Sequence, residues 1–324
     1  MSAVTRVAAI DCGTNSIRLL VADVDLDAGT LVDLDRRQEV VRLGQGVDRT
    51  GRLAPEALAR TLDATRRYAA VCRELGADEV RFVATSASRD AENRADFVDG
   101  VLAAIGVEPE VVAGTEEARL SFRGATSVVS ARQPGPYLVV DLGGGSTELV
   151  LGDDEPEAAW SMDVGCVRLT ERHLHSDPPT AAEVAAAEAD VHAALDEAAR
   201  TVPLGRTTTL VGLAGSVTTV TAHALGLETY QPQRIDGSVL TVDATIAACD
   251  DLLARTREQR AALGFMHPGR VDVIGAGALV WRAVVRRVRD EVAAAGGSLT
   301  HTVTSEHDIL DGIAWSAAER AARR

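Results

Sequence analysis

The sequence predicts an α/β protein built from two similar lobes. Three observations predict this fold class: strand and helix patterns alternate along the chain, a strand–turn–strand segment occurs twice, and the length allows two domains. At about 150 residues per domain, 324 residues suffice for two cores. Aromatic residues make up only 3% of the chain, so alanine, valine, leucine and isoleucine must fill those cores.

The repeated segment lies at residues 8–16 (AAIDCGTNS) and 138–146 (LVVDLGGGS). In both copies an apolar run leads into Asp-x-Gly, a small polar turn ends on serine, and a second apolar run follows. Asp11 and Asp141 are 130 residues apart, and the following glycine and serine keep this offset. Two apolar runs around such a turn predict a β-hairpin, and the long spacing indicates a duplicated domain. Chance similarity of two glycine turns is the alternative.

Between the two hairpins the pattern alternates helix and strand. Apolar spacing predicts, in order, a helix over 55–75, a strand over 80–84, a helix over 95–105 and a strand over 107–112. Gly76 ends the first of these helices. Thr115 is a candidate N-cap for a further helix, whose first turn holds Glu116 and Glu117, acids that the helix dipole favours there.

The second half continues in the same way after a linker candidate at 133–136 (QPGP). The predicted elements are a helix over 179–200, a strand over 208–213, and helices over 243–262, 277–295 and 305–324. We therefore place one lobe at 1–128 and the other at 129–304. The helix at 305–324 is expected to pack back on the first lobe.

Composition and charge exclude several classes of function. All 33 basic residues are arginine, which excludes a P-loop lysine and every Schiff-base mechanism. A net charge of −15 argues against duplex nucleic acid as the main partner. The four cysteines form no CxxC pair, and no apolar run approaches a membrane span or a signal peptide. These features predict a cytoplasmic protein that binds no membrane.

The glycine turn at 141–148 (DLGGGSTE) is suited to bind phosphate. Without Cβ atoms, its backbone can approach an anion closely and direct N–H groups at it. Asp141 and Glu148 bracket the turn, and hard oxygen ligands beside phosphate are how Mg²⁺ is usually held. A plain hairpin with exposed acids is the alternative. The related turn in the other lobe favours phosphate.

Seven motifs together resemble those of the exopolyphosphatase / guanosine pentaphosphatase family. They occur in the family's order, at 11–16 (DCGTNS), 84–89 (ATSASR), 114–119 (GTEEAR), 141–148 (DLGGGSTE), 215–218 (GSVT), 270–275 (RVDVIG) and 305–312 (SEHDILDG). The resemblance covers nearly the whole chain and is to the short, two-domain actinobacterial members. It implies two RNase H-like lobes of the actin, sugar-kinase and Hsp70 superfamily, with an active-site cleft between them.

The resemblance also implies a reaction and a site. The reaction is metal-dependent hydrolysis of the terminal phosphate of inorganic polyphosphate, of guanosine pentaphosphate (pppGpp, giving ppGpp), or of both. Glu117 matches the catalytic base, and Arg89 matches the arginine that clamps phosphate. The implied phosphate-binding residues are Thr14, Asn15, Ser16, Gly143, Gly144, Gly145, Ser146, Gly215, Ser216 and Arg270. The implied ligands of Mg²⁺ or Mn²⁺ are Asp141, Glu148 and Asp11.

Two departures and two alternatives belong beside this interpretation. Residues 270–277 read RVDVIGAG where RADVIPGG is common, and Thr14 replaces the commoner serine but keeps the hydroxyl. Residues 274–278 (IGAGA) are similar to the adenosine-binding glycines of sugar kinases, which makes an ATP-dependent small-molecule kinase one alternative. A non-catalytic alarmone-binding regulator, which would not need Glu117, is the other. We also expect a homodimer.

Overall fold

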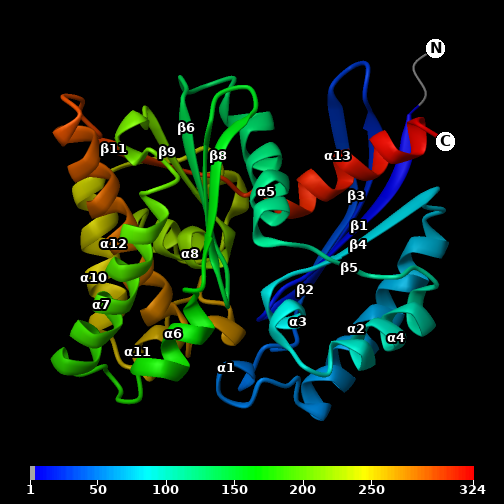
Figure 1. The fold of residues 1–324 in the computed structure, drawn as a ribbon, viewed down its shortest axis with the longest axis horizontal. Coiled ribbons are helices and arrows are strands. Elements are labelled where there is room, and N and C mark those ends of the chain that lie inside the picture. The colour runs from blue at the N-terminus through cyan, green and yellow to red at the C-terminus, as the bar shows by residue number, and fades with distance from the viewer. Residues whose placement is uncertain (1–3) are drawn as a thin grey trace. The chain divides into compact units, whose positions relative to one another are not determined.

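The computed structural model describes residues 4–324, the side chain of Asp90 excepted. The chain forms two compact units. The N-terminal unit contains the chain up to Gly124 together with Ile309–Arg324, and the C-terminal unit is Ala125–Asp308 (Figure 1). No helix among the described residues is long and apolar enough to cross a lipid bilayer.

The N-terminal unit is built on a five-stranded sheet in the order β3-β2-β1-β4-β5. The strands are β1 (Thr5–Cys12), β2 (Ser16–Asp25), β3 (Thr30–Val40), β4 (Glu79–Ala84) and β5 (Glu110–Val111). The first three pair antiparallel, whereas β4 joins β1 and β5 joins β4 in parallel. The helices are α1 (Val47–Thr50), α2 (Pro55–Glu74), α3 (Ser86–Asp90), α4 (Arg94–Ile105), α5 (Gly114–Val129) and α13 (Ile309–Ala322).

Alternation along β1 gives this sheet two covered faces. Ala8 and Ile10 pack with residues of α2 and α4, whereas Val7 and Ala9 pack with residues of α13 and with Leu120 of α5. Successive side chains of a strand point to opposite faces, so the nearly continuous apolar run of β1 reflects burial on both sides. The strand that carries the first glycine turn is therefore held from both faces.

The C-terminal unit repeats this arrangement in a six-stranded sheet of order β10-β11-β9-β6-β7-β8. Its strands are β6 (Tyr137–Leu142), β7 (Thr147–Gly152), β8 (Pro156–Met162), β9 (Thr209–Leu213), β10 (Val239–Thr241) and β11 (His301–Thr304). Its helices are α6 (Cys166–His173), α7 (Ala181–Ala198), α8 (Ala214–Ala224), α9 (Pro232–Ile235), α10 (Val242–Ala254), α11 (Arg257–Ala261) and α12 (Ile274–Ala294), with short 3₁₀ turns at Leu204–Arg206 and Pro268–Arg270.

The two sheets confirm the predicted pair of similar α/β lobes. The order β8-β7-β6-β9-β11 matches β3-β2-β1-β4-β5, with the same antiparallel and parallel pairings. Both hairpins of the repeated segment form where the sequence predicts them. The change from one unit to the other falls inside α5, at Gly124, and not in the predicted linker at 133–136.

Several predicted boundaries were wrong, each for a local reason. The helix predicted over 243–262 is two helices, because Thr256 forms a capping box with Gln259 and starts α11. The strand predicted over 107–112 shrinks to β5, two residues at the edge of the sheet. Thr115 is not an N-cap, because the N–H groups of Glu116 and Glu117 donate to the carbonyl of Ala113 and α5 starts at Gly114.

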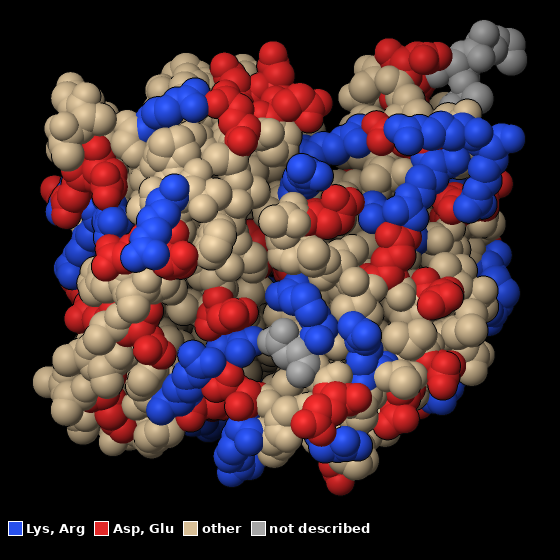
Figure 2. Space-filling view, in the orientation of Figure 1, with Lys and Arg blue, Asp and Glu red and all other residues tan. Residues whose placement is uncertain are grey.

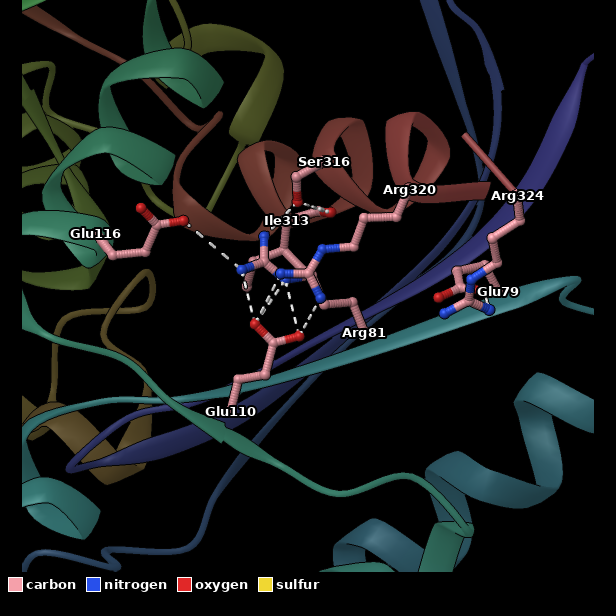
Figure 3. A network of polar contacts seen from close by, with 8 residues as sticks. All are labelled: Glu79, Arg81, Glu110, Glu116, Ile313, Ser316, Arg320 and Arg324. Atoms are coloured by element: carbon pink, nitrogen blue, oxygen red, sulfur yellow. Dashed lines mark hydrogen bonds and ion pairs between the residues drawn. The ribbon is translucent and has the colours of Figure 1, made fainter. Parts of the chain in front are cut away.

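The helix α13 is fixed to the N-terminal sheet by a network of arginines (Figure 3). Arg81 of β4 is buried and forms an ion pair with Glu110 of β5 at 2.9 Å. Its guanidinium also donates to Ser316 of α13, and Arg320 of α13 donates to the same Glu110 carboxylate. Burial acts to raise the pKa of Glu110, but the hydrogen bonds from Arg320 and Arg81 outweigh it and lower that pKa.

Replacing Glu110 with alanine is expected to lower the free energy of unfolding by about 3 kcal/mol, near the lower end for removing the partner of a buried charge, because Arg81 stays buried without its nearest carboxylate. Equilibrium urea unfolding measures the loss. Asp63→Ala is the matched control, since Asp63 and Arg66 pair on the exposed surface of α2, and exposed pairs contribute at most about 1 kcal/mol. Equal losses in the two variants would contradict this role for the network.

Candidate functional site

The two repeated turns have the same backbone geometry. The N–H of Gly13 donates to the carbonyl of Ser16 at 2.9 Å, and the N–H of Gly143 donates to the carbonyl of Ser146 at 3.0 Å. A Cβ atom on Gly143 would lie 3.0 Å from the Ser146 carbonyl oxygen, so this position has little room for a side chain. Each turn thus closes its hairpin tightly at the end of the first strand of its sheet.

In the N-terminal unit, two further segments hold the turn formed by Thr14 and Asn15. The loop after β3 donates from its backbone to the carbonyls of Thr14 and Asn15, at 2.9–3.1 Å. The hydroxyl of Thr14 shares a buried hydrogen bond of 2.9 Å with that of Ser86, the first residue of α3. Arg89 lies one helical turn beyond Ser86, so α3 carries the predicted arginine beside the predicted phosphate turn.

Arg89 and Glu117 lie together. The Arg89 guanidinium donates to the Glu117 carboxylate at 3.3 Å and to the carbonyl of Val112 at 3.1 Å. Glu117 is buried in the first turn of α5, where its negative charge is favourable to the helix dipole. The predicted base and the predicted phosphate clamp therefore form one ion pair in the N-terminal unit.

In the C-terminal unit, the segment before α6 holds the triple-glycine turn. Backbone N–H groups of Cys166 and Val167 donate to the carbonyls of Gly143 and Gly144 at 3.0 and 2.8 Å. The Arg168 guanidinium donates to the carbonyl of Gly145 at 2.7 Å. Because these bonds engage the carbonyl oxygens, the turn is fixed from the side opposite to an anion that its N–H groups would bind.

Asp11 and Asp141 occupy equivalent positions in the two hairpins, but the residues opposite them on the neighbouring strands differ. In the first hairpin Asp11 faces Arg18, which binds its carboxylate at 2.7 Å. In the second hairpin Asp141 faces Glu148, so two buried carboxylates stand directly opposite each other on one ladder. Like charges in such a position are destabilising unless a cation compensates them. The pair is thus the stronger candidate for a divalent cation, and Asp11 is engaged with Arg18.

The hydroxyl of Ser161 in β8 also donates to the Glu148 carboxylate at 2.7 Å. Within residues 4–324, no three His, Cys, Asp or Glu side chains gather into a metal-binding group. The candidate cation site is accordingly a two-carboxylate site.

Gly215, Ser216 and Arg270 form a second polar group in the C-terminal unit. Gly215 and Ser216 lie in the first turn of α8, and a Cβ atom on Gly215 would lie 2.3 Å from the Arg270 guanidinium carbon. The Arg270 side chain, from the 3₁₀ turn before α12, reaches the hydroxyl of Thr219 at 3.5 Å. The structure thus places Arg270 beside the first turn of α8, and the phosphate-binding role of the three residues stays a prediction.

The glycines that resemble a kinase adenosine site have a packing role. A Cβ atom on Gly277 would lie 2.4 Å from the hydroxyl of Ser216, and one on Gly275 would lie 3.2 Å from a nitrogen of Arg260. Their lack of a side chain is therefore explained by contacts inside the C-terminal unit.

The predicted residues thus divide between the units. The N-terminal unit holds Asp11, Thr14, Asn15, Ser16, Arg89 and Glu117, and the C-terminal unit holds Asp141, Gly143, Gly144, Gly145, Ser146, Glu148, Gly215, Ser216 and Arg270. Sequence reasoning missed Ser86, Arg18, Ser161 and Arg168. Ser86 lies in the quoted ATSASR motif, and Arg18 has the same 130-residue offset from Glu148 as Asp11 from Asp141, so both had a signal.

Comparisons with known proteins agree with the motifs. The chain is 52% identical over 323 residues to Exopolyphosphatase 2 of Mycobacterium tuberculosis, covering 98% of this chain and 99% of the relative. It is similar to the crystal structure of an exopolyphosphatase-like protein, with 49% identity, a TM-score of 0.95, and 98% and 99% of the two chains covered. The Aquifex aeolicus PPX-GPPA enzyme is 29% identical, with a TM-score of 0.78 over 97% of this chain and 100% of that one.

The profile of one family spans most of the sequence. That of the Ppx/GppA phosphatases matches residues 20–306, which include all of the candidate residues except Asp11 and those of the first turn. The match at the level of family, relatives and solved structures leads to one conclusion: the chain belongs to the Ppx/GppA phosphatase family.

Proposed function

We propose that the protein is an exopolyphosphatase, which hydrolyses the terminal phosphate of inorganic polyphosphate. The Arg89–Glu117 ion pair beside the Thr14 turn carries the proposal. A cationic side chain that holds phosphate and a carboxylate that can accept a proton from water both assist hydrolysis of a phosphoric anhydride. The 52% identity to Exopolyphosphatase 2 of Mycobacterium tuberculosis supports polyphosphate as the substrate.

In the proposed reaction a water molecule attacks the terminal phosphorus atom. Glu117 accepts a proton from that water, and the bond from phosphorus to the bridging oxygen breaks, which releases orthophosphate and a chain shorter by one unit. Arg89 holds an oxygen of the terminal phosphoryl group. Because Arg89 already contacts Glu117, a phosphoryl group on the arginine lies within reach of a water on the carboxylate.

The backbone N–H groups of the two glycine turns are proposed to bind phosphate oxygens as well. In the first turn the residues are Thr14, Asn15 and Ser16; in the second they are Gly143, Gly144, Gly145 and Ser146. Gly215, Ser216 and Arg270 are proposed to add N–H groups at the start of α8 and one cationic side chain. All of these groups bind negative charge without base-specific recognition.

Mg²⁺ or Mn²⁺ fits the Asp141–Glu148 pair. The two facing carboxylates supply hard oxygen ligands, and Mg²⁺ is commonly held by one or two carboxylates together with substrate phosphates. When bound, the cation would neutralise charge that develops on the phosphate oxygens. Asp11 is already held in an ion pair with Arg18. The cytoplasmic location and the homodimer remain predictions.

Guanosine pentaphosphate is proposed as a weaker or comparable substrate. The proposed contacts are to phosphate, and the sequence contains no recognisable guanine-binding element. The kinase alternative has less support, because the glycines at 274–278 serve packing. A regulator without activity would need neither the Arg89–Glu117 pair nor the Asp141–Glu148 pair.

Phosphate release should be measured in parallel from long-chain polyphosphate, guanosine pentaphosphate and ATP, with purified protein. Polyphosphate is expected to have the highest kcat/KM. A hundredfold preference for guanosine pentaphosphate, about 2.7 kcal/mol of differential transition-state binding, would overturn the proposed order of substrates. Formation of ADP only in the presence of a small-molecule acceptor would favour a kinase.

A further inference from the structure

A groove of about 610 Å³ lies on the surface of the N-terminal unit. Its walls are α1, the loop from α1 to α2, the first turns of α2 and the start of α4. The side chain of Asn93 fixes this shape, because it accepts from the N–H of Leu53 at 2.8 Å and donates to the carbonyl of Leu53 at 3.2 Å. The groove is separate from the residues assigned to the reaction.

The groove is nevertheless built on the proposed phosphate turn. Gly44 donates its N–H to the carbonyl of Thr14 at 2.9 Å, and a Cβ atom there would lie 2.3 Å from the Thr14 methyl group. The groove lining begins at the next residue, Gln45, and continues through α1. Thr14 and the groove wall are thus connected through close backbone contact, with no intervening element.

The charge of the groove is unusual for this chain. Most arginines here form ion pairs with Asp or Glu, and Figure 2 shows basic and acidic side chains interspersed over the face drawn. Within residues 4–324, by contrast, neither Arg49 nor Arg60 of the lining forms an ion pair with a carboxylate. The Arg60 Nε donates to the carbonyl of Val41 at 3.0 Å, which anchors that guanidinium at the wall.

Two other features also favour binding of an anion in the groove. Arg52 is a third lining arginine, and its guanidinium pairs at 3.3 Å with the exposed Glu92, a pair that a stronger anion can displace. The 20-residue helix α2 begins in the groove with Pro55 at its first turn and without a side-chain cap, so its N-terminal dipole faces the same space. Glu56 and Asp96 also line the groove and oppose an anion there.

We propose that this groove binds inner phosphates of a linear polyphosphate whose end lies at the Thr14–Asn15 turn. The inference rests on the proposed function and deepens it, because it makes Arg49 and Arg60 determinants of chain-length preference. Polyphosphate is a flexible chain with one negative charge per unit. The arginines of the groove can bind it through charge alone, without requiring a fixed shape of the ligand. A short substrate would end before it reaches the groove.

The test compares long-chain polyphosphate with tripolyphosphate in the double variant Arg49→Gln/Arg60→Gln of the full chain. KM for the long chain is expected to rise about tenfold at low salt through loss of two exposed charge contacts, with kcat unchanged. For tripolyphosphate both constants should stay within about twofold. The slope of log KM against log salt for the long chain should fall by about 1.4, from about 0.7 for each lost arginine on a flexible polyanion.

Two single variants complete the test. Arg73→Gln removes a positive charge from the other end of α2 and should leave KM and kcat for both substrates unchanged. Glu56→Gln removes an opposing acid from the groove and should lower KM for the long chain. An equal effect of the double variant on both substrates, or no effect on either, would overturn the proposal that the groove binds inner phosphates. Phosphate release from tripolyphosphate would still support the proposed function in that case. If the wild-type protein releases no phosphate from any of the substrates, the proposed function itself is wrong.

Discussion

Replacing Glu117 with glutamine is expected to lower kcat for polyphosphate by about 10²–10⁴-fold, the range typical of a general base. Glutamine keeps the size of the side chain and can still accept the hydrogen bond from Arg89, so the ion-pair geometry is perturbed little. It cannot take a proton from water. KM should stay unchanged or fall, because a negative charge beside a polyanionic substrate is lost.

The neighbouring acid gives the matched control. Glu116 precedes Glu117 in the first turn of α5, and it lies 3.7 Å from Arg81, in the network that holds α13 (Figure 3). Glu116→Gln should retain nearly wild-type kcat. If Glu117→Gln keeps the wild-type kcat and circular dichroism, and Glu116→Gln loses it, then Glu116 is the base.

Arg89 separates binding from chemistry in the same assay. An arginine that holds phosphate in both the ground state and the transition state contributes to KM as well as to kcat. The Glu117 variant should therefore lower kcat without raising KM, whereas loss of Arg89 should lower kcat and raise KM. This contrast identifies which partner of the 3.3 Å pair moves the proton.

Local signals explain why the hairpins were predictable from sequence. An Asp-x-Gly turn between apolar runs fixes strand, turn and pairing within a few residues, and the second copy repeats it. The same register also places Arg18 opposite Asp11 and Glu148 opposite Asp141. This difference can be found in the sequence, because Arg18 and Glu148 have the same 130-residue offset as Asp11 and Asp141. It distinguishes the hairpin whose aspartate pairs with an arginine from the hairpin whose two carboxylates fit a cation.

Contacts between distant segments were not predictable in this way. Arg81 and Ser316 are 235 residues apart, and no periodic pattern connects a buried arginine in one strand to the last helix. The pairing of Arg89 with Glu117 likewise depends on how α3 and α5 pack, and only the family resemblance brought these residues together beforehand. The groove at Arg49 and Arg60 has no motif, because charge in a loop and on a helix surface is ordinary in sequence.

The Asp141–Glu148 pair leads to a prediction that joins stability with activity. Glu148→Gln should abolish phosphate release at ordinary Mg²⁺, or raise the Mg²⁺ needed by more than the 10–100-fold typical of losing an outer-shell partner. In excess EDTA, however, the same variant should be more stable than the wild type. The substitution removes one of two buried like charges that face each other, and the amide oxygen can still accept from Ser161.

Thermal unfolding in EDTA, with and without added Mg²⁺, tests both halves of this prediction. Relief of a cross-strand like-charge pair is on the order of 1 kcal/mol, which corresponds to about 2–4 °C for a unit of this size. The wild type should gain stability with Mg²⁺ by mass action, and Glu148→Gln should gain little. Glu155→Gln, at an exposed acid between β7 and β8, should behave as the wild type does.

Full activity of the wild type in excess EDTA would show that the reaction does not need the cation. A Glu148→Gln variant that is less stable in EDTA would show that the carboxylate serves the fold and not the cation.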